Sequence, residues 1–180
     1  MRFTVLIAAL AAAALPFPAL AALPVGAKAP AFSTMGAKAG ADRKITLREA
    51  LRKGPVVLYF YPKAFTQGCT LEAHAFSEAT DEFAKAGATV IGMSADAMPE
   101  LRKFSREGCR DKFTVAQATP AIVKDYDVSL TKPDGSATGV TSRTSYVIDR
   151  SGRVVFVHSD MDWREHVNMT LAAVRALKRR

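Results

Sequence analysis

Two apolar segments separated by a helix-length segment constrain the fold of this chain more than any other feature. The segments VVLYFY (56–61) and ATVIGMSA (88–95) are continuous apolar runs rich in β-branched and aromatic residues. Such runs are typical of strands that are buried on both faces of a sheet. Between them, residues 69–86 carry apolar side chains three or four positions apart, which predicts an amphipathic helix. Two buried strands joined by a helix predict a parallel pair at the centre of an α/β sheet.

A hairpin and three further helices are predicted around this parallel pair. A hairpin added to a parallel pair predicts an α/β, thioredoxin-like fold, with a mixed central sheet flanked by helices. Residues 22–40 are rich in Pro, Gly and Ala, and we expect them to form an irregular segment that lies over the domain. The predicted elements are a helix at 46–54 with a Thr46–Glu49 capping box, a helix at 99–108, a hairpin at 144–158, and a last helix that starts at Asp162 with a second capping box at Glu165.

The first 21 residues have the pattern of a secretory signal peptide. Arg2 precedes an apolar stretch, and Ala19 and Ala21 form a small-x-small cleavage site. An uncleaved membrane anchor is the alternative, but the apolar stretch is short for a membrane span and two prolines interrupt it. We therefore predict a signal peptide at residues 1–21, a single mature domain at 22–180, and export to the periplasm.

The charge of the chain does not indicate a nucleic-acid partner. The formal net charge is +8, but lysine and arginine are scattered along the sequence apart from the C-terminal KRR. Nucleic acid or an anionic membrane would attract a basic surface, and a dedicated site for either would concentrate the charge in a patch. We expect a basic solvated surface, with no nucleic-acid partner and no membrane partner after cleavage.

Cys69 is the residue that most strongly suggests chemistry. The chain has two cysteines, and Thr66 stands where a C-x-x-C motif would place the partner of Cys69. Cys69 follows a predicted strand and loop at the start of a helix, where free backbone N–H groups and the helix dipole favour a thiolate. A helix terminus contributes at most about 2 kcal/mol. We therefore expect the Thr66 hydroxyl and a cation from a distant segment to stabilise the thiolate further.

The segment YFYPKAFTQGCTLE (59–72) resembles the active-site segment of the peroxiredoxins. Their pattern P-x-x-x-[T/S]-x-x-C is filled here by Pro62, Thr66 and Cys69. The GCT-x-E continuation and the later RTSYVIDRSGRV are similar to the Q-type, or bacterioferritin-comigratory-protein, branch of the alkyl hydroperoxide reductase/thiol-specific antioxidant superfamily. The resemblance runs from about Val25 to the C-terminus and implies the peroxiredoxin variant of the thioredoxin-like fold.

The resemblance implies a thiol-dependent peroxidase that reduces hydrogen peroxide and organic hydroperoxides. Cys69 would be the peroxidatic cysteine, whose thiolate becomes a sulfenic acid. Thr66 would hold the thiolate and the incoming oxygen, Pro62 would shield the site from water, and Arg143 would be the missing cation. The reductant would be a thioredoxin-like protein or another thiol. We expect no cofactor, no metal and a monomer.

The sequence departs from the branch at the position of its usual resolving cysteine, where His74 stands. The resemblance leaves Cys109 as the candidate that would close an intramolecular disulfide with Cys69. Since the two Cα atoms must come within about 4.4–6.8 Å, we expect local unwinding on oxidation. Cys109 as a buried apolar residue, with an external thiol acting on Cys69, stays an alternative. A permanent Cys69–Cys109 staple, a thioredoxin-like thiol–disulfide oxidoreductase and a non-enzymatic binding domain also stay open.

Three other polar residues near the predicted elements receive less weight. Glu72, one turn after Cys69, is expected to make a local hydrogen bond and to take no direct part in catalysis. His158 and His166 do not have metal-ligand spacing with carboxylates, which agrees with the expectation of no metal.

Overall fold

The centre of the sheet agrees with the sequence prediction. The computed structural model describes residues 22–178, so the predicted signal peptide lies outside the described residues. Strands β3 (Val56–Phe60) and β4 (Thr89–Ser94) pair in parallel, and α2 (Gln67–Lys85) connects them. All five residues of β3 are buried. The predicted parallel pair of buried strands is therefore confirmed.

The complete sheet is mixed and has seven strands in the order β2-β1-β5-β4-β3-β8-β9. The predicted hairpin is formed by β8 (Thr144–Ile148) and β9 (Val154–Ser159), and β8 pairs antiparallel with β3. On the other side, β5 (Thr114–Gln117) pairs in parallel with β4. The mixed α/β sheet of a thioredoxin-like fold is therefore confirmed.

The prediction that residues 22–40 are irregular is wrong at their C-terminal end. Strands β1 (Ser33–Lys38) and β2 (Ala41–Thr46) form an antiparallel hairpin, and β1 joins the sheet beside β5. A Cβ atom on Gly36 would lie 2.5 Å from the carbonyl oxygen of Val115. Glycine is needed at position 36 because the backbones approach closely, and its low strand propensity weakens the strand signal in the sequence.

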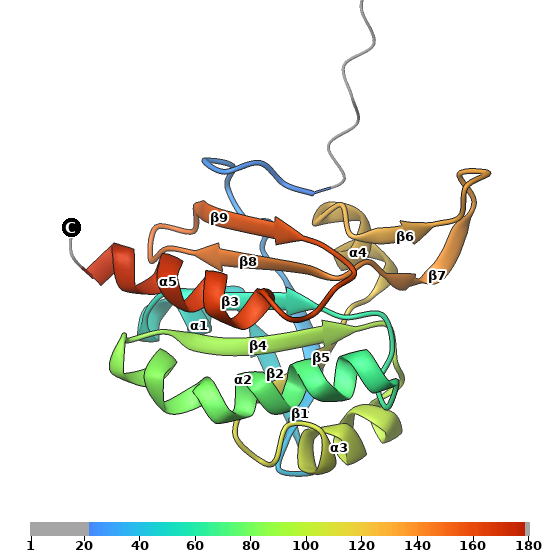
Figure 1. The fold of residues 1–180 in the computed structure, drawn as a ribbon, viewed down its shortest axis with the longest axis horizontal. Helices are drawn as coiled ribbons and strands as arrows, with labels where there is room; N and C mark the ends of the chain where they lie inside the picture. The colour runs from blue at the N-terminus through green and yellow to red at the C-terminus, as the bar shows by residue number, and fades with distance from the viewer. Residues whose placement is uncertain (1–21, 179–180) are drawn as a thin grey trace, which may run out of the picture.

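Helices cover both faces of the sheet, as Figure 1 shows. One core layer packs β3 and its neighbours against α2, α3 (Met98–Glu107) and α5 (His166–Lys178). The opposite layer packs the sheet against α1 (Leu47–Lys53) and α4 (Pro120–Asp125), an element that the sequence did not predict. Among residues 22–178, no helix combines the length and the apolarity that a membrane span needs.

The helix ends agree with the sequence in one case and not in another. Thr46 is confirmed as the N-cap residue of α1, because its hydroxyl accepts from the Glu49 amide at 3.2 Å. The predicted capping box is only half formed, since the Glu49 carboxylate accepts from the Thr46 hydroxyl at 3.0 Å and not from the Thr46 backbone amide. The predicted start of α5 at Asp162 is wrong, since α5 begins at His166. Asp162 instead accepts from the backbone and side chain of Arg164 in a separate turn.

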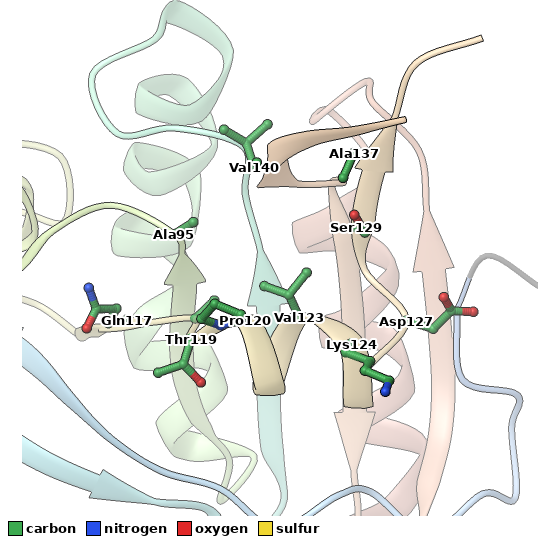
Figure 2. A pocket seen from close by; sticks show the side chains of 12 residues that line it. Ala95, Gln117, Thr119, Pro120, Val123, Lys124, Asp127, Ser129, Ala137 and Val140 are labelled. Atoms are coloured by element: carbon green, nitrogen blue, oxygen red, sulfur yellow. The ribbon is translucent and has the colours of Figure 1, made fainter. Parts of the chain in front are cut away.

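A two-stranded arm of β6 (Ser129–Thr131) and β7 (Ala137–Thr141) projects beyond α4 (Figure 1). A hollow of about 660 Å³ lies between this arm, α4 and the residues that follow β4 and β5. Figure 2 shows its mainly apolar lining, which includes Pro120, Val123 and Val140. The predicted site residues do not line this hollow.

Candidate active site

Cys69 lies in the first turn of α2, close to where the sequence predicted the start of this helix. The helix begins at Gln67, two residues earlier than predicted. The Cys69 side chain is nearly enclosed, with 2% of the residue exposed. Because the first N–H groups of a helix have no partner within it, this position favours an anionic sulfur.

Two hydrogen bonds fix the loop that connects β3 to Cys69. The carbonyl oxygen of Tyr61 accepts from the Thr141 hydroxyl at 2.7 Å. The amide of Ala64 donates to the Asp96 carboxylate at 2.8 Å. Phe65 then adopts a φ of 63°, in the left-handed region that non-glycine residues rarely occupy. Pro62 lies half-buried in this fixed loop, and its predicted shielding role stays a prediction.

Arg143 lies next to Cys69 although 74 positions separate them in the sequence. Its Nη2 atom donates to the Cys69 sulfur at 3.5 Å, and its Nε atom donates to the carbonyl oxygen of Met161 at 3.0 Å. The residue is 4% exposed. A Cβ atom on Gly68 would lie 3.3 Å from Nη2, so glycine leaves room for the guanidinium. The fold thus places a fixed cation beside the thiol.

Glu72 does not make the local hydrogen bond expected from the sequence. Its Oε2 atom instead accepts from Nη1 of Arg143, and the residue is fully buried. Burial raises the pKa of Glu72 to about 8, while the guanidinium of Arg143 acts in the opposite direction. Cys69 and Glu72 are three positions apart and therefore lie on one helix face, which was the available signal for a shared partner.

Thr66 is the N-cap residue of α2, but the structure does not join its hydroxyl to the sulfur. Thr66 Oγ1 donates to the carbonyl oxygen of Lys63 at 3.0 Å, and its side chain is exposed. Among the described residues, Arg143 provides the hydrogen bond to Cys69 that the structure contains. The predicted contact of Thr66 with a bound peroxide stays a prediction.

Cys109 is fully buried just after α3 and, like Cys69, is a free thiol. Both cysteines belong to the core layer between the sheet and α2. Burial raises the pKa of the Cys109 thiol far above its ordinary value. The Ser77 hydroxyl of α2 lies 2.9 Å from the Cys109 carbonyl oxygen, and Arg110 and Asp111 follow with φ values of 47° and 60°. Cys109 therefore sits before a strained turn that two contacts tie to α2, the Ser77 hydrogen bond and an ion pair between Arg110 and Glu78 at 3.1 Å.

His166 was not expected near a carboxylate, but the structure places it beside Glu72. Its Nδ1 atom lies 3.9 Å from Glu72 Oε1, and its ring centroid lies 4.5 Å from that of His158. Burial lowers the pKa of His166 to about 4. Across residues 22–178, no three His, Cys, Asp or Glu side chains are arranged to hold a metal ion. The sequence separation of 94 positions between Glu72 and His166 left no local signal for their approach.

Comparison with known proteins places this site in a family. A model described as the AhpC/TSA family matches residues 25–157. The chain belongs to the AhpC/TSA family. The match covers the Cys69 loop, both cysteines, Glu72 and Arg143. The resemblance to Q-type peroxiredoxins is also confirmed, because similar curated proteins carry that name.

Two relatives and two solved structures show how far the similarity of this AhpC/TSA chain extends. The chloroplastic peroxiredoxin Q of Sedum lineare is 32% identical over 125 residues, which are 69% of this chain and 65% of that protein. Peroxiredoxin Bcp of Bacillus subtilis is 29% identical over 153 residues, covering 84% and 94%. The structure of peroxidoxin BcpB from Mycobacterium tuberculosis superposes with a TM-score of 0.75 at 31% identity, covering 85% and 97%. For peroxiredoxin Q of Xanthomonas campestris the TM-score is 0.70 at 29% identity, covering 80% and 90%.

In this peroxiredoxin, the site can stabilise negative charge at a defined point. Glu72 and the Met161 carbonyl orient the guanidinium of Arg143 through Nη1 and Nε. The remaining Nη2 group faces Cys69, where both a thiolate and an oxygen bound to it can accept hydrogen bonds. Since Arg143 is held before any substrate arrives, little reorganisation is needed when charge develops.

Proposed function

We propose that this peroxiredoxin is a thiol-dependent peroxidase that reduces hydrogen peroxide and organic hydroperoxides. The observation that carries the proposal is the 3.5 Å contact between Arg143 Nη2 and the Cys69 sulfur in a nearly enclosed site. The absence of a C-x-x-C motif at Cys69, where Thr66 stands, argues against a thioredoxin-like thiol–disulfide oxidoreductase. Membership of a peroxiredoxin family supports the same conclusion.

In the first step, the Cys69 thiolate attacks one oxygen of the peroxide. An S–O bond forms while the O–O bond breaks, so the sulfur is oxidised by two electrons and the peroxide is reduced. The leaving hydroxide or alkoxide takes up one proton and departs as water or alcohol. Arg143 donates to the charge on sulfur and on the leaving oxygen, Thr66 holds the attacked oxygen, and Pro62 limits the access of water.

In the second step, Cys109 resolves the sulfenic acid. Its sulfur forms a disulfide with Cys69, water leaves, and a thioredoxin-like protein or another thiol later reduces the disulfide. Because the raised pKa keeps the buried Cys109 thiol protonated, the turn after α3 has to open before Cys109 can attack. The φ values of Arg110 and Asp111 support opening at this turn. Should Cys109 not resolve, an external thiol acting directly on Cys69 takes its place.

Export and a monomeric state complete the proposal. The family match begins at residue 25, just after the signal-like segment at 1–21. We expect the mature chain in the periplasm to begin near Ala22, which cell fractionation and N-terminal sequencing would test. Analytical ultracentrifugation of the reduced mature protein would test the monomer. A protein retained with its first 21 residues, or a stable dimer, would refute the respective parts.

Mass spectrometry after one equivalent of hydrogen peroxide tests the chemistry. The reduced mature protein is compared with Cys109→Ser and with Cys69→Ser. A mapped Cys69–Cys109 disulfide in the native chain, replaced by a Cys69 sulfenic acid in Cys109→Ser, would support both steps. A sulfenic acid at Cys69 in both proteins would leave an external thiol as the resolving group. An unmodified Cys69 would refute the peroxidase, and insulin reduction would then test the oxidoreductase alternative.

A further inference from the structure

We propose that His166 is a positioning residue that keeps the guanidinium of Arg143 beside the Cys69 sulfur. The inference rests on the proposed function, since positioning matters here for the reaction of Cys69 with peroxide. It concerns a residue that does not touch the thiol. His166 is the first residue of α5 and is fully buried.

The hydrogen bonds of His166 determine which ring nitrogen carries the proton. Nε2 lies 2.9 Å from the backbone carbonyl oxygen of Asp160, which can only accept, so Nε2 must donate. In the neutral ring, Nδ1 is then an acceptor, and the Ser145 hydroxyl at 2.8 Å is its donor. The network therefore assigns a neutral imidazole protonated on Nε2.

The hydrogen bond from His166 Nε2 anchors residues 160–162, and the Met161 carbonyl oxygen in this segment accepts from Arg143 Nε. The Asp160 amide donates to the Arg143 carbonyl oxygen at 3.2 Å. The next residue, Met161, accepts from Arg143 Nε at 3.0 Å. Asp160, Met161 and Asp162 are all exposed, so this segment has little packing of its own. The hydrogen bond to the buried imidazole of His166 therefore fixes the position of this exposed segment.

Nδ1 of His166 faces Glu72, which is the second group that fixes the position of Arg143. Glu72 Oε1 lies 3.9 Å from Nδ1 and has no hydrogen-bond partner among the described residues, while Oε2 accepts from Arg143. A protonated Nδ1 would place a second positive charge beside Glu72, and this charge would repel the guanidinium of Arg143. The arrangement at Arg143 therefore depends on a neutral His166.

The surroundings of His166 keep the ring neutral. The charged or titratable groups that face it are Glu72 on α2, Arg143 before β8, His158 on β9 and Asp160 after β9. Burial lowers the pKa of His166, the proximity of His158 and of the Arg143 guanidinium acts in the same direction, and Asp160 opposes them. His166 is thus uncharged over the range in which a peroxidase would work.

Two polar variants distinguish the role of Nε2 of His166 from that of Nδ1. The amide nitrogen of His166→Gln reaches the position of Nε2 and can donate to Asp160, whereas His166→Asn reaches only the position of Nδ1. His74→Gln is the matched control, because His74 is another histidine on the chain that lies on α2 outside this network. Trp163, the only tryptophan, lies 3.7 Å from where a Gly68 Cβ would be and can report on the reaction by fluorescence.

The measurements are the second-order rate constant with hydrogen peroxide, by stopped flow, and the rate of Cys69 alkylation by iodoacetamide as a function of pH. We expect His166→Asn to lower the peroxide rate roughly 10- to 100-fold and to shift the alkylation profile to higher pH. His166→Gln should recover most of both, and His74→Gln should match the native protein.

Equal rates and profiles for both His166 variants and the native protein would overturn the proposal. Equal losses in Gln and Asn, with an unchanged alkylation profile, would show a merely structural role and overturn it as well. If the native protein does not react with peroxide, the proposed function fails. The alkylation profiles still decide the positioning of Arg143 in that case, so the two failures are distinguishable.

Discussion

Replacing Arg143 by glutamine removes the charge beside Cys69 and keeps a polar side chain in its place. In the native structure, Nη2 of Arg143 lies 3.5 Å from the sulfur, and the residue is 4% exposed. Arg143→Lys is the control that keeps the charge but loses the planar fork of donors. The pair of variants therefore separates the contribution of charge from that of geometry.

The expected loss follows from the contact distance. At 3.5 Å and an effective dielectric constant of about 20, two unit charges attract by about 5 kcal/mol. This is an upper bound, because the Glu72 carboxyl on the other side of the guanidinium offsets part of the attraction. Removing one preorganised donor to a developing negative charge usually costs about 10²–10³ in rate. We expect a loss of that size for Arg143→Gln and a partial recovery for Arg143→Lys.

The same variant has a predicted pH dependence of stability. Without Arg143, Glu72 stays buried and loses the group that opposes its raised pKa. A carboxyl whose pKa is higher in the folded state than in the unfolded state makes its full contribution to the stability of the folded protein at pH values below the unfolded pKa. The stabilisation is lost as the pH rises towards the folded pKa. Because the folded-state pKa of Glu72 is already about 8 in the native protein, we expect both proteins to lose stability in parallel between about pH 4.5 and pH 8, and Arg143→Gln to become progressively less stable than the native protein above about pH 8.

Stopped-flow Trp163 fluorescence with hydrogen peroxide gives the rates, and urea unfolding at several pH values gives the stabilities. A folded Arg143→Gln protein that reacts within threefold of the native rate would refute the role of the guanidinium. Full activity of Arg143→Lys would refute the argument from fork geometry. Stability of Arg143→Gln that rises with pH relative to the native protein would contradict the reasoning on Glu72.

Three further predictions concern the same region. Gly68→Ala places a Cβ 3.3 Å from Arg143 Nη2, so we expect a severalfold slower peroxide reaction with little change in urea stability; an unchanged rate would contradict this. Because burial raises the pKa of the Cys109 thiol, iodoacetamide at pH 8 should label Cys109 only after denaturation, and peptide mass mapping of the folded protein would reveal any exception. Ser77→Ala removes the donor from α2 to the Cys109 carbonyl oxygen and leaves the Lys112 amide as its donor, so we expect about 1 kcal/mol lower unfolding free energy and faster disulfide formation. Slower disulfide formation in Ser77→Ala would argue against opening at this turn.

Much of the central fold could be predicted because its signals are local. The apolar runs at β3 and β4 and the N-cap of Thr46 each depend on neighbouring residues. Strand β1 was missed because Gly36, which weakens its strand signal, is required by the close approach of β5, about 80 positions away along the chain. The start of α5 was misplaced because Asp162 caps a separate turn. Errors therefore arose where a distant segment decided the local structure.

The sequence by itself determined the parallel core, the position of Cys69 at a helix start and the family of the chain. These depend on apolar periodicity and on the short spacing from Pro62 to Cys69, which the chain carries in consecutive residues. The family resemblance predicted Arg143 as the cation for Cys69, and only the tertiary structure showed its 3.5 Å contact with the sulfur, the bond from Arg143 to Glu72 and the place of His166 beside Glu72. Side chains that meet across more than 70 positions have no periodic signal, because packing and burial in the folded chain decide which of them come together.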